Sequence, residues 1–89
     1  MEFEWHSSKA TRNLVKHGVS FEKATEVFAD LLSSTVTDPD RSVGESRFLL
    51  FGMTASGRHL AVAFTERGDR IRIVSARPMT RSERKAYEQ

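Results

Sequence analysis

The clearest pattern in the sequence is an alternation of apolar and polar residues in its last third. Two β-favouring runs, 60–65 and 71–75, flank the dipeptide Gly68-Asp69. This spacing is typical of a hairpin closed by a two-residue turn. From Arg70 onward the chain alternates arginine and isoleucine, at Arg70, Ile71, Arg72 and Ile73. Because successive side chains on a strand point to opposite faces, the hairpin is predicted to have one apolar and one cationic face.

The turn also predicts a register. Pairing Arg67 with Arg70 places Arg72 among small residues of the neighbouring strand, on the cationic face. Strict alternation puts Arg77 on the apolar face instead. For Arg77 to share a site with the other arginines, the strand has to bulge or end near Ser75.

Helical periodicity characterises the first third of the chain. A helix is predicted over residues 9–16, capped by Ser7 or Ser8 and ended by His17-Gly18, and a second over 21–29. Their spacing makes an αα-hairpin that packs on a sheet. The residues expected to face the core are Ala10, Leu14 and Val15 in the first helix and Phe21, Ala24, Val27 and Phe28 in the second.

Further strands and one more helix complete the prediction. The expected strands are 2–5, 34–37, 47–53, 59–66 and the last run, with a turn at 38–41. A capping box at Thr80 and Glu83 begins a helix that ends near Tyr87. The predicted fold class is α+β, with a short N-terminal strand and the αα-hairpin on an antiparallel meander of about four strands. Residues 1–89 are expected to form a single domain.

Composition excludes several kinds of chemistry. The 89 residues contain no cysteine, which rules out disulfides, thiolate nucleophiles and Cys-ligated zinc. The three histidines match no metal signature, so neither a metal nor another cofactor is expected. No apolar run is long enough to cross a bilayer and the N-terminus does not resemble a signal peptide, which predicts a soluble cytoplasmic protein. The net charge of +2 gives only a weak indication of a polyanionic partner.

Each candidate site residue has a structural explanation beside the functional one. Arginines 70 and 72 form either a phosphate platform or an ordinary solvated sheet face. Glu66 is either a surface ion-pair partner or a general base. His17 either stabilises the C-terminal end of the first predicted helix, where the helix dipole is negative, or acts as an acid or base. Tyr87 either stacks on a nucleic-acid base or packs within the protein.

The order and spacing of many short segments resemble the BrnT family of bacterial type II toxins. The matching segments are 3–5, 16–22, 27–30, 38–40, 45–48, 57–58, 65–77 and 80–88. One departure is His6, where the family usually has Asp or Asn after the tryptophan. A cap role at that position would then pass to Ser7 or Ser8.

The resemblance implies a RelE-like ribonuclease that cleaves RNA without a metal ion and so inhibits translation and growth. It also implies neutralisation by a BrnA-like antitoxin with a ribbon-helix-helix fold. The expected assembly is a heterotetramer built around an antitoxin dimer, which contacts operator DNA through the antitoxin.

Within this family, Arg72 and Arg77 are expected to hold phosphate, with Glu66 or His17 as base or acid. The residues expected to contact the RNA backbone or to stack on it are Arg70, Lys9, Lys16 and Tyr87. The alternative is a non-catalytic module that binds nucleic acid or the antitoxin and acts as a corepressor. A degenerate toxin that serves only as the antitoxin's structural partner is a third possibility.

Overall fold

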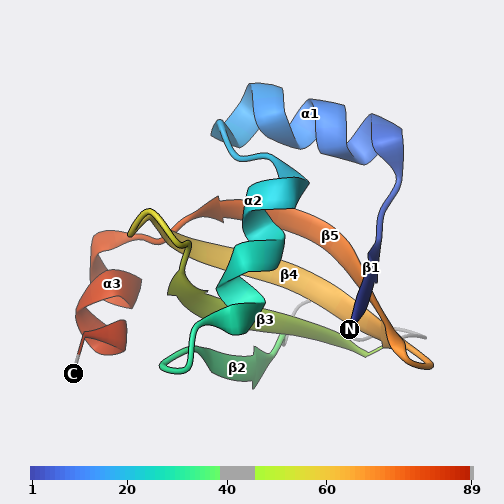
Figure 1. The fold of residues 1–89 in the computed structure, drawn as a ribbon. Helices are drawn as coiled ribbons and strands as arrows, with labels where there is room; N and C mark the ends of the chain where they lie inside the picture. The colour runs from blue at the N-terminus through green and yellow to red at the C-terminus, as the bar shows by residue number, and fades with distance from the viewer. Residues whose placement is uncertain (39–45, 89) are drawn as a thin grey trace.

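The computed structural model describes residues 1–38 and 46–88 (Figure 1). The elements along the chain are β1 (Glu2–Glu4), α1 (Ser7–His17), α2 (Phe21–Glu26), the 3-10 turn η1 (Val27–Ala29), β2 (Ser34–Thr37), β3 (Arg47–Met53), β4 (His59–Arg67), β5 (Arg70–Pro78) and α3 (Arg81–Tyr87). Most of the turn expected at 38–41 lies outside the described residues. None of the helices in the described ranges is long and apolar enough to span a membrane.

The strands form one mixed sheet in the order β1-β5-β4-β3-β2. The run from β2 to β5 is the predicted antiparallel meander. β1 adds a fifth strand, parallel to β5, with Phe3 beside Ile71. The predicted N-terminal strand is therefore confirmed, and it makes the sheet mixed rather than purely antiparallel.

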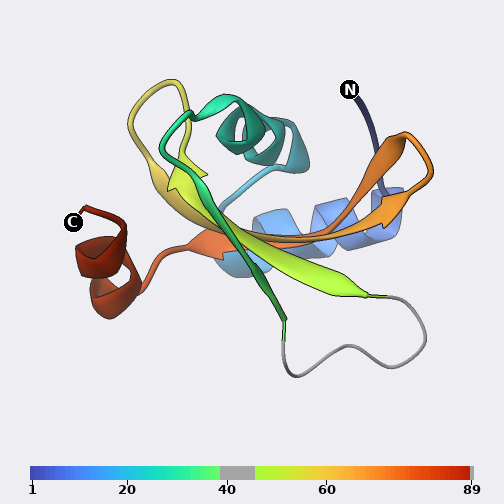
Figure 2. The same cartoon turned by 90° about the horizontal axis from the view of Figure 1, so that it is seen from below.

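The hydrophobic core lies on one face of the sheet, beneath α2 and η1 (Figures 1 and 2). Phe21 and Val27 from these helices are fully buried against strand residues such as Ile73. Burying a side chain as large as Phe21 stabilises the fold by roughly 1.5–3 kcal/mol. Gly52 allows the close approach of η1, because a Cβ at that position would lie 2.8 Å from a methyl of Val27. The predicted inward face of the second helix is confirmed.

The first helix packs differently from the prediction. Leu14 is 51% and Val15 84% exposed, so the expectation that they face the core is wrong. The buried residue of α1 is Asn13. The predicted serine cap is also wrong, because His6 occupies the N-cap position without a side-chain hydrogen bond and Ser7 is already helical. α1 therefore lies along the β5 edge of the sheet, and the two helices do not form a hairpin on one flat face (Figure 1).

Asn13 holds α1 to this edge by three hydrogen bonds. Its side-chain amide donates to the carbonyls of Ala76, at 2.8 Å, and Val19, at 2.9 Å. Its carbonyl oxygen accepts the Ala76 N–H at 3.1 Å. β1 pairs only with residues 70–72 of β5, so the Asn13 side chain supplies the strand partner that Ala76 otherwise lacks.

The β4–β5 pairing contains one irregularity that decides where Arg77 points. From the turn, Arg67 pairs with Arg70 and Thr65 with Arg72, as predicted. The register then shifts next to Phe64, so Ala63 pairs with Ser75 and Ala61 with Arg77. Val74 is the extra residue of this β-bulge. Arg77 consequently lies on the same face as Arg72. A bulge near Ser75 was the feature that these two arginines needed in order to share a site.

Replacement of Asn13 by alanine is expected to lower the free energy of unfolding by about 2–4 kcal/mol, because it leaves buried backbone groups of Ala76 and Val19 without partners. Urea denaturation followed by circular dichroism measures this loss. The matched control is Thr11→Ala on the exposed side of the same helix, which should change stability by less than about 0.5 kcal/mol. Equal effects of the two variants would contradict the role given to Asn13.

Candidate functional site

The second face of the sheet, opposite α2, carries the predicted arginines. Strand pairing places Arg47 of β3, Thr65 of β4, Arg72 of β5 and Glu4 of β1 in one row across this face. Thr65 is 3% exposed, and its hydroxyl has no hydrogen-bond partner in the described structure. Alanines 61 and 63 continue the β4 part of this face, so its centre is made of small, buried residues.

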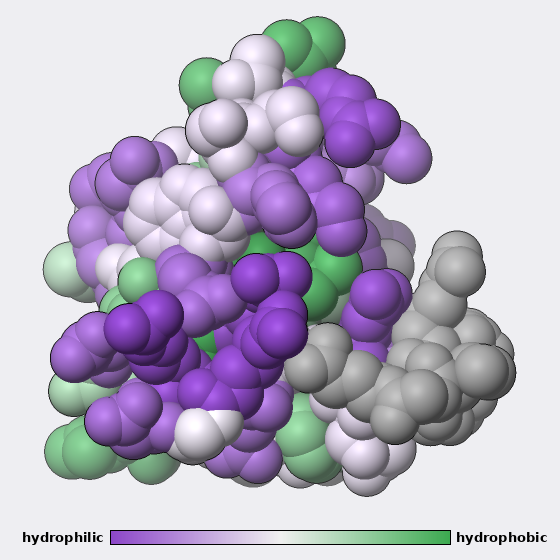
Figure 3. Space-filling model, turned by 90° about the vertical axis from the view of Figure 1, so that its right-hand side faces the viewer, coloured by the Kyte–Doolittle hydropathy of each residue, from purple (hydrophilic) through white to green (hydrophobic). Residues whose placement is uncertain are grey.

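Arg70 and Arg72 are neutralised by the glutamates of β1. Nε and Nη2 of Arg72 both lie 2.9 Å from Oε2 of Glu4. Arg70 lies 3.7 Å from Glu2 and 3.5 Å from Glu4. Hydrogen bonding from Arg72 lowers the pKa of Glu4 below its usual value. This end of the molecule is largely hydrophilic (Figure 3), but its arginines already have carboxylate partners.

Arg77 is also paired. Its Nη1 and Nη2 atoms bind the two carboxylate oxygens of Glu83, at 2.7 Å and 2.9 Å. This hydrogen bonding lowers the pKa of Glu83 to about 2. Glu83 also accepts the Thr80 N–H in the predicted capping box, which is confirmed. The pair therefore fixes the start of α3 to the end of β5.

Four cations without described partners lie in an open groove between α1 and the sheet, with a volume of about 550 Å³. Its lining residues are Lys9, Arg12, Asn13, Lys16 and His17 of α1, Arg47 of β3, and Val74 and Ser75 of the β5 bulge. Within the described ranges, Lys9, Arg12, Lys16 and Arg47 form no ion pair or side-chain hydrogen bond. The groove is thus a concentration of positive charge beside a histidine, which suits a polyanion.

The structure brings some of the predicted site residues together and separates others. Lys9, Lys16 and His17 share the groove. Glu66 is exposed opposite Ile71, on the face away from Arg72.

Tyr87 has a packing role in the structure. Its hydroxyl donates to Asp30 at 2.5 Å, and its ring meets His59 edge-on. The bond to Asp30 raises the pKa of Tyr87 to about 12.

Sequence reasoning missed Arg12 and Arg47. The signal for Arg12 was present, because Lys9, Arg12 and Lys16 fall at i, i+3 and i+7 on one helical stripe around Asn13. Arg47 carried no comparable signal, because its place beside the groove depends on α1 lying against that face of the sheet. Among the described residues, no group of three or more His, Asp or Glu is placed to hold a metal ion.

The α+β fold with a cationic groove beside an exposed helix is suited to a polyanionic ligand. Residues 5–83 match the family described as the ribonuclease toxin BrnT of type II toxin-antitoxin systems. The crystal structure of the Brucella abortus ribonuclease toxin BrnT is similar, with a TM-score of 0.68 and 26% sequence identity over 91% of this chain and 99% of that chain. No curated protein matches the chain.

The chain therefore belongs to the BrnT family of ribonuclease toxins. The resemblance noted in the sequence is confirmed, as is the expected class of function, an RNA-cleaving enzyme of a type II toxin-antitoxin system. Membership of such a system implies two partners, an RNA target and a protein antitoxin.

Removing the charge of Glu83 should destabilise the protein in a pH-dependent way. The pKa of Glu83 falls from 4.5 to about 2 on folding, so the pair with Arg77 stabilises the fold above pH 4.5 and this contribution is lost as the pH falls toward 2. Glu83→Gln, which keeps an acceptor for the cap, should cost about 1–2 kcal/mol at pH 7.

Thermal unfolding at several pH values measures this difference. The gap between the melting temperatures of wild type and Glu83→Gln should narrow as the pH falls from 5 toward 2. Glu88→Gln, which removes an exposed partner of Arg84, is the control and should show a smaller gap. A pH-independent gap for Glu83→Gln would contradict the ion-pair account.

Proposed function

We propose that this protein cleaves RNA in the groove between α1 and the sheet, without a metal ion. The observation that supports the proposal is the set of four cations without described partners that surrounds His17. Guanidinium and ammonium groups bind phosphate oxygens directly and can stabilise the charge that a metal would otherwise neutralise. In this proposal residues 1–89 act as one RelE-like domain in the cytoplasm, where its RNA target is found.

The reaction that fits such a groove is attack by a ribose 2′-oxygen on the adjacent phosphorus. The P–O5′ bond then breaks, which leaves a 2′,3′-cyclic phosphate and a 5′-hydroxyl. One proton must leave the 2′-oxygen and one must reach the 5′-oxygen. His17 contributes the groove's imidazole, a group that can accept and donate a proton, and we assign one of these transfers to it. The other passes through water in the open groove.

The phosphate carries an additional negative charge as the fifth oxygen approaches. Arg12 and Arg47 come from opposite walls of the groove, α1 and β3, so together they can contact phosphate oxygens from two sides. Lys9 and Lys16 extend the positive surface along α1 for neighbouring phosphates.

Arg72 and Arg77 were expected to bind phosphate. In this proposal they have a structural role instead. Each binds a carboxylate through two short contacts, and these contacts would have to break for the guanidinium to turn fully to a phosphate. We propose that they position β1 and α3 around the site. Glu66, on the opposite face, would take no part in the proton transfers.

Family membership supports the proposed partners. The antitoxin is expected to be BrnA-like, with a ribbon-helix-helix fold, and to form a heterotetramer around an antitoxin dimer. Operator DNA would be contacted through the antitoxin rather than through the toxin.

Neutralising the groove should reduce RNA cleavage more than removing the sheet arginines. Arg12→Gln and Arg47→Gln are each expected to lower the cleavage rate about 10- to 100-fold, the effect of losing one charge-assisted phosphate contact. His17→Gln should lower it by about 10²–10⁴-fold. The control is Lys23→Gln on α2, across the sheet from the groove, which should cleave like wild type.

Cleavage of a labelled RNA in the presence of a metal chelator measures these rates, and analysis of the 3′ ends identifies the cyclic phosphate. Loss of activity in chelator would contradict the metal-free reaction. If Arg72→Ala and Arg77→Ala abolish cleavage in folded protein while Arg12→Gln and His17→Gln do not, the site lies at the sheet arginines instead. RNA binding without any product would favour the non-catalytic module.

A further inference from the structure

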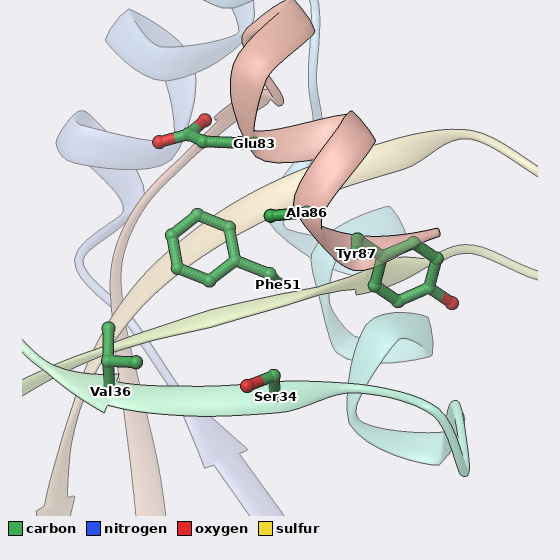
Figure 4. A pocket seen from close by; sticks show the side chains of 6 residues that line it. All are labelled: Ser34, Val36, Phe51, Glu83, Ala86 and Tyr87. Carbon is green, nitrogen blue, oxygen red and sulfur yellow. The ribbon is translucent and has the colours of Figure 1, made fainter. Parts of the chain in front are cut away.

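A second cavity, of about 240 Å³, opens between α3 and the strands β2 and β3, at the β2 edge of the sheet. It is lined by Ser34, Val36, Phe51, Glu83, Ala86 and Tyr87. Figure 4 shows the side chains of Val36 and Ser34 from β2, Phe51 from β3 and Ala86 from α3 turned toward the same space. Apart from Glu83 and the serine hydroxyl, this lining is apolar. We refer to it as the α3 pocket.

The α3 pocket is open to solvent and rigidly supported. Val36 is 45% exposed, and Ala86 is exposed on the pocket side of the helix. α3 is fixed near both of its ends, by the pair between Glu83 and Arg77 and by the hydrogen bond from Tyr87 to Asp30. A preformed apolar pocket loses little conformational entropy when a side chain enters it.

The α3 pocket and the groove lie on the same face of the sheet. Phe51 pairs with Ala61, which pairs in turn with Arg77, and Ala63 pairs with Ser75 at the groove. Ala61 and Ala63 of β4 and Leu49 of β3 lie between the two sites on this face. A single extended polypeptide crossing β4 can therefore reach both.

We propose that the antitoxin binds across this face, with an apolar side chain in the α3 pocket and acidic residues over the groove. This inference rests on the proposed function, because it assumes that the antitoxin neutralises the toxin by covering the RNA site. The occupant is assigned to the antitoxin because the family implies a protein partner. The antitoxin segment over the groove is expected to be acidic, because the groove contains four cations without described partners.

The two contacts contribute different properties to the complex. The α3 pocket provides apolar burial, which salt does not screen and which acts mainly on the dissociation rate. The groove provides charge complementarity, which is weakened by salt and accelerates association. RNA and the antitoxin would compete for the groove, while the pocket would give the antitoxin an anchor that RNA does not use.

The test uses the purified toxin and the antitoxin encoded in the adjacent reading frame, with affinity measured by calorimetry at several salt concentrations. Ala86→Gln places a longer neutral side chain in the α3 pocket and keeps the helical propensity of α3. It should weaken antitoxin binding at least about tenfold at every salt concentration, with RNA cleavage unchanged. Arg12→Gln should instead reduce the salt dependence of binding.

Lys85→Gln, next to Ala86 on α3 but outside the pocket lining, is the matched control and should bind antitoxin within about twofold of wild type. A second pocket variant, Val36→Asp on the exposed strand β2, should also weaken binding and keeps the test valid if Ala86→Gln fails to fold.

Three outcomes would overturn the inference. The first is wild-type antitoxin affinity in both folded pocket variants. The second is equal weakening by Lys85→Gln. The third is a toxin dimer in light scattering that Ala86→Gln dissociates, which would assign the pocket to a second copy of this chain. The proposed function has a separate failure, which is wild-type RNA cleavage by Arg12→Gln and His17→Gln whatever the antitoxin does.

Discussion

The side chain of Asn13 replaces a strand at the point where β1 stops pairing with β5. By bonding both backbone groups of Ala76 and the carbonyl of Val19, it holds α1 against the sheet edge and fixes the turn into α2. The groove depends on this attachment, because Asn13 lies at the centre of the helical stripe that carries its cations. A buried amide, rather than an apolar stripe, thus orients the helix that we propose binds RNA.

The cations of β5 and of the groove form two groups. The arginines of β5 face carboxylates on β1 and α3, at distances that hold the strands and the last helix in place. The cations of α1 and Arg47 have no such partners in the described ranges. A guanidinium paired with a carboxylate has its charge compensated and fewer N–H donors left for a phosphate, whereas an unpaired one loses only water on binding. This difference is the physical reason for placing the RNA site at the groove.

Much of the sheet could be predicted from sequence, because strand alternation and turn chemistry are local. The hairpin at Gly68-Asp69 and the capping box at Thr80 are examples. The inward face of α1 could not be predicted, because the partner of Asn13 lies 63 residues away. The neutralisation of Arg72 was also hidden, because it requires β1 to lie beside β5. The bulge at Val74 differs from these features, because strand alternation already showed that Arg77 could share a face with Arg72 only if the strand bulged or ended near Ser75.

The most direct test of the account is NMR titration of the toxin with a 2′-fluoro RNA oligonucleotide, which lacks the attacking hydroxyl and so cannot be cleaved by the proposed route. The account predicts that the largest amide shift changes fall on the groove, at residues 9–17, Arg47, Val74 and Ser75. Changes confined to residues 2–4 and 67–72, at the β1 and hairpin end, would contradict it.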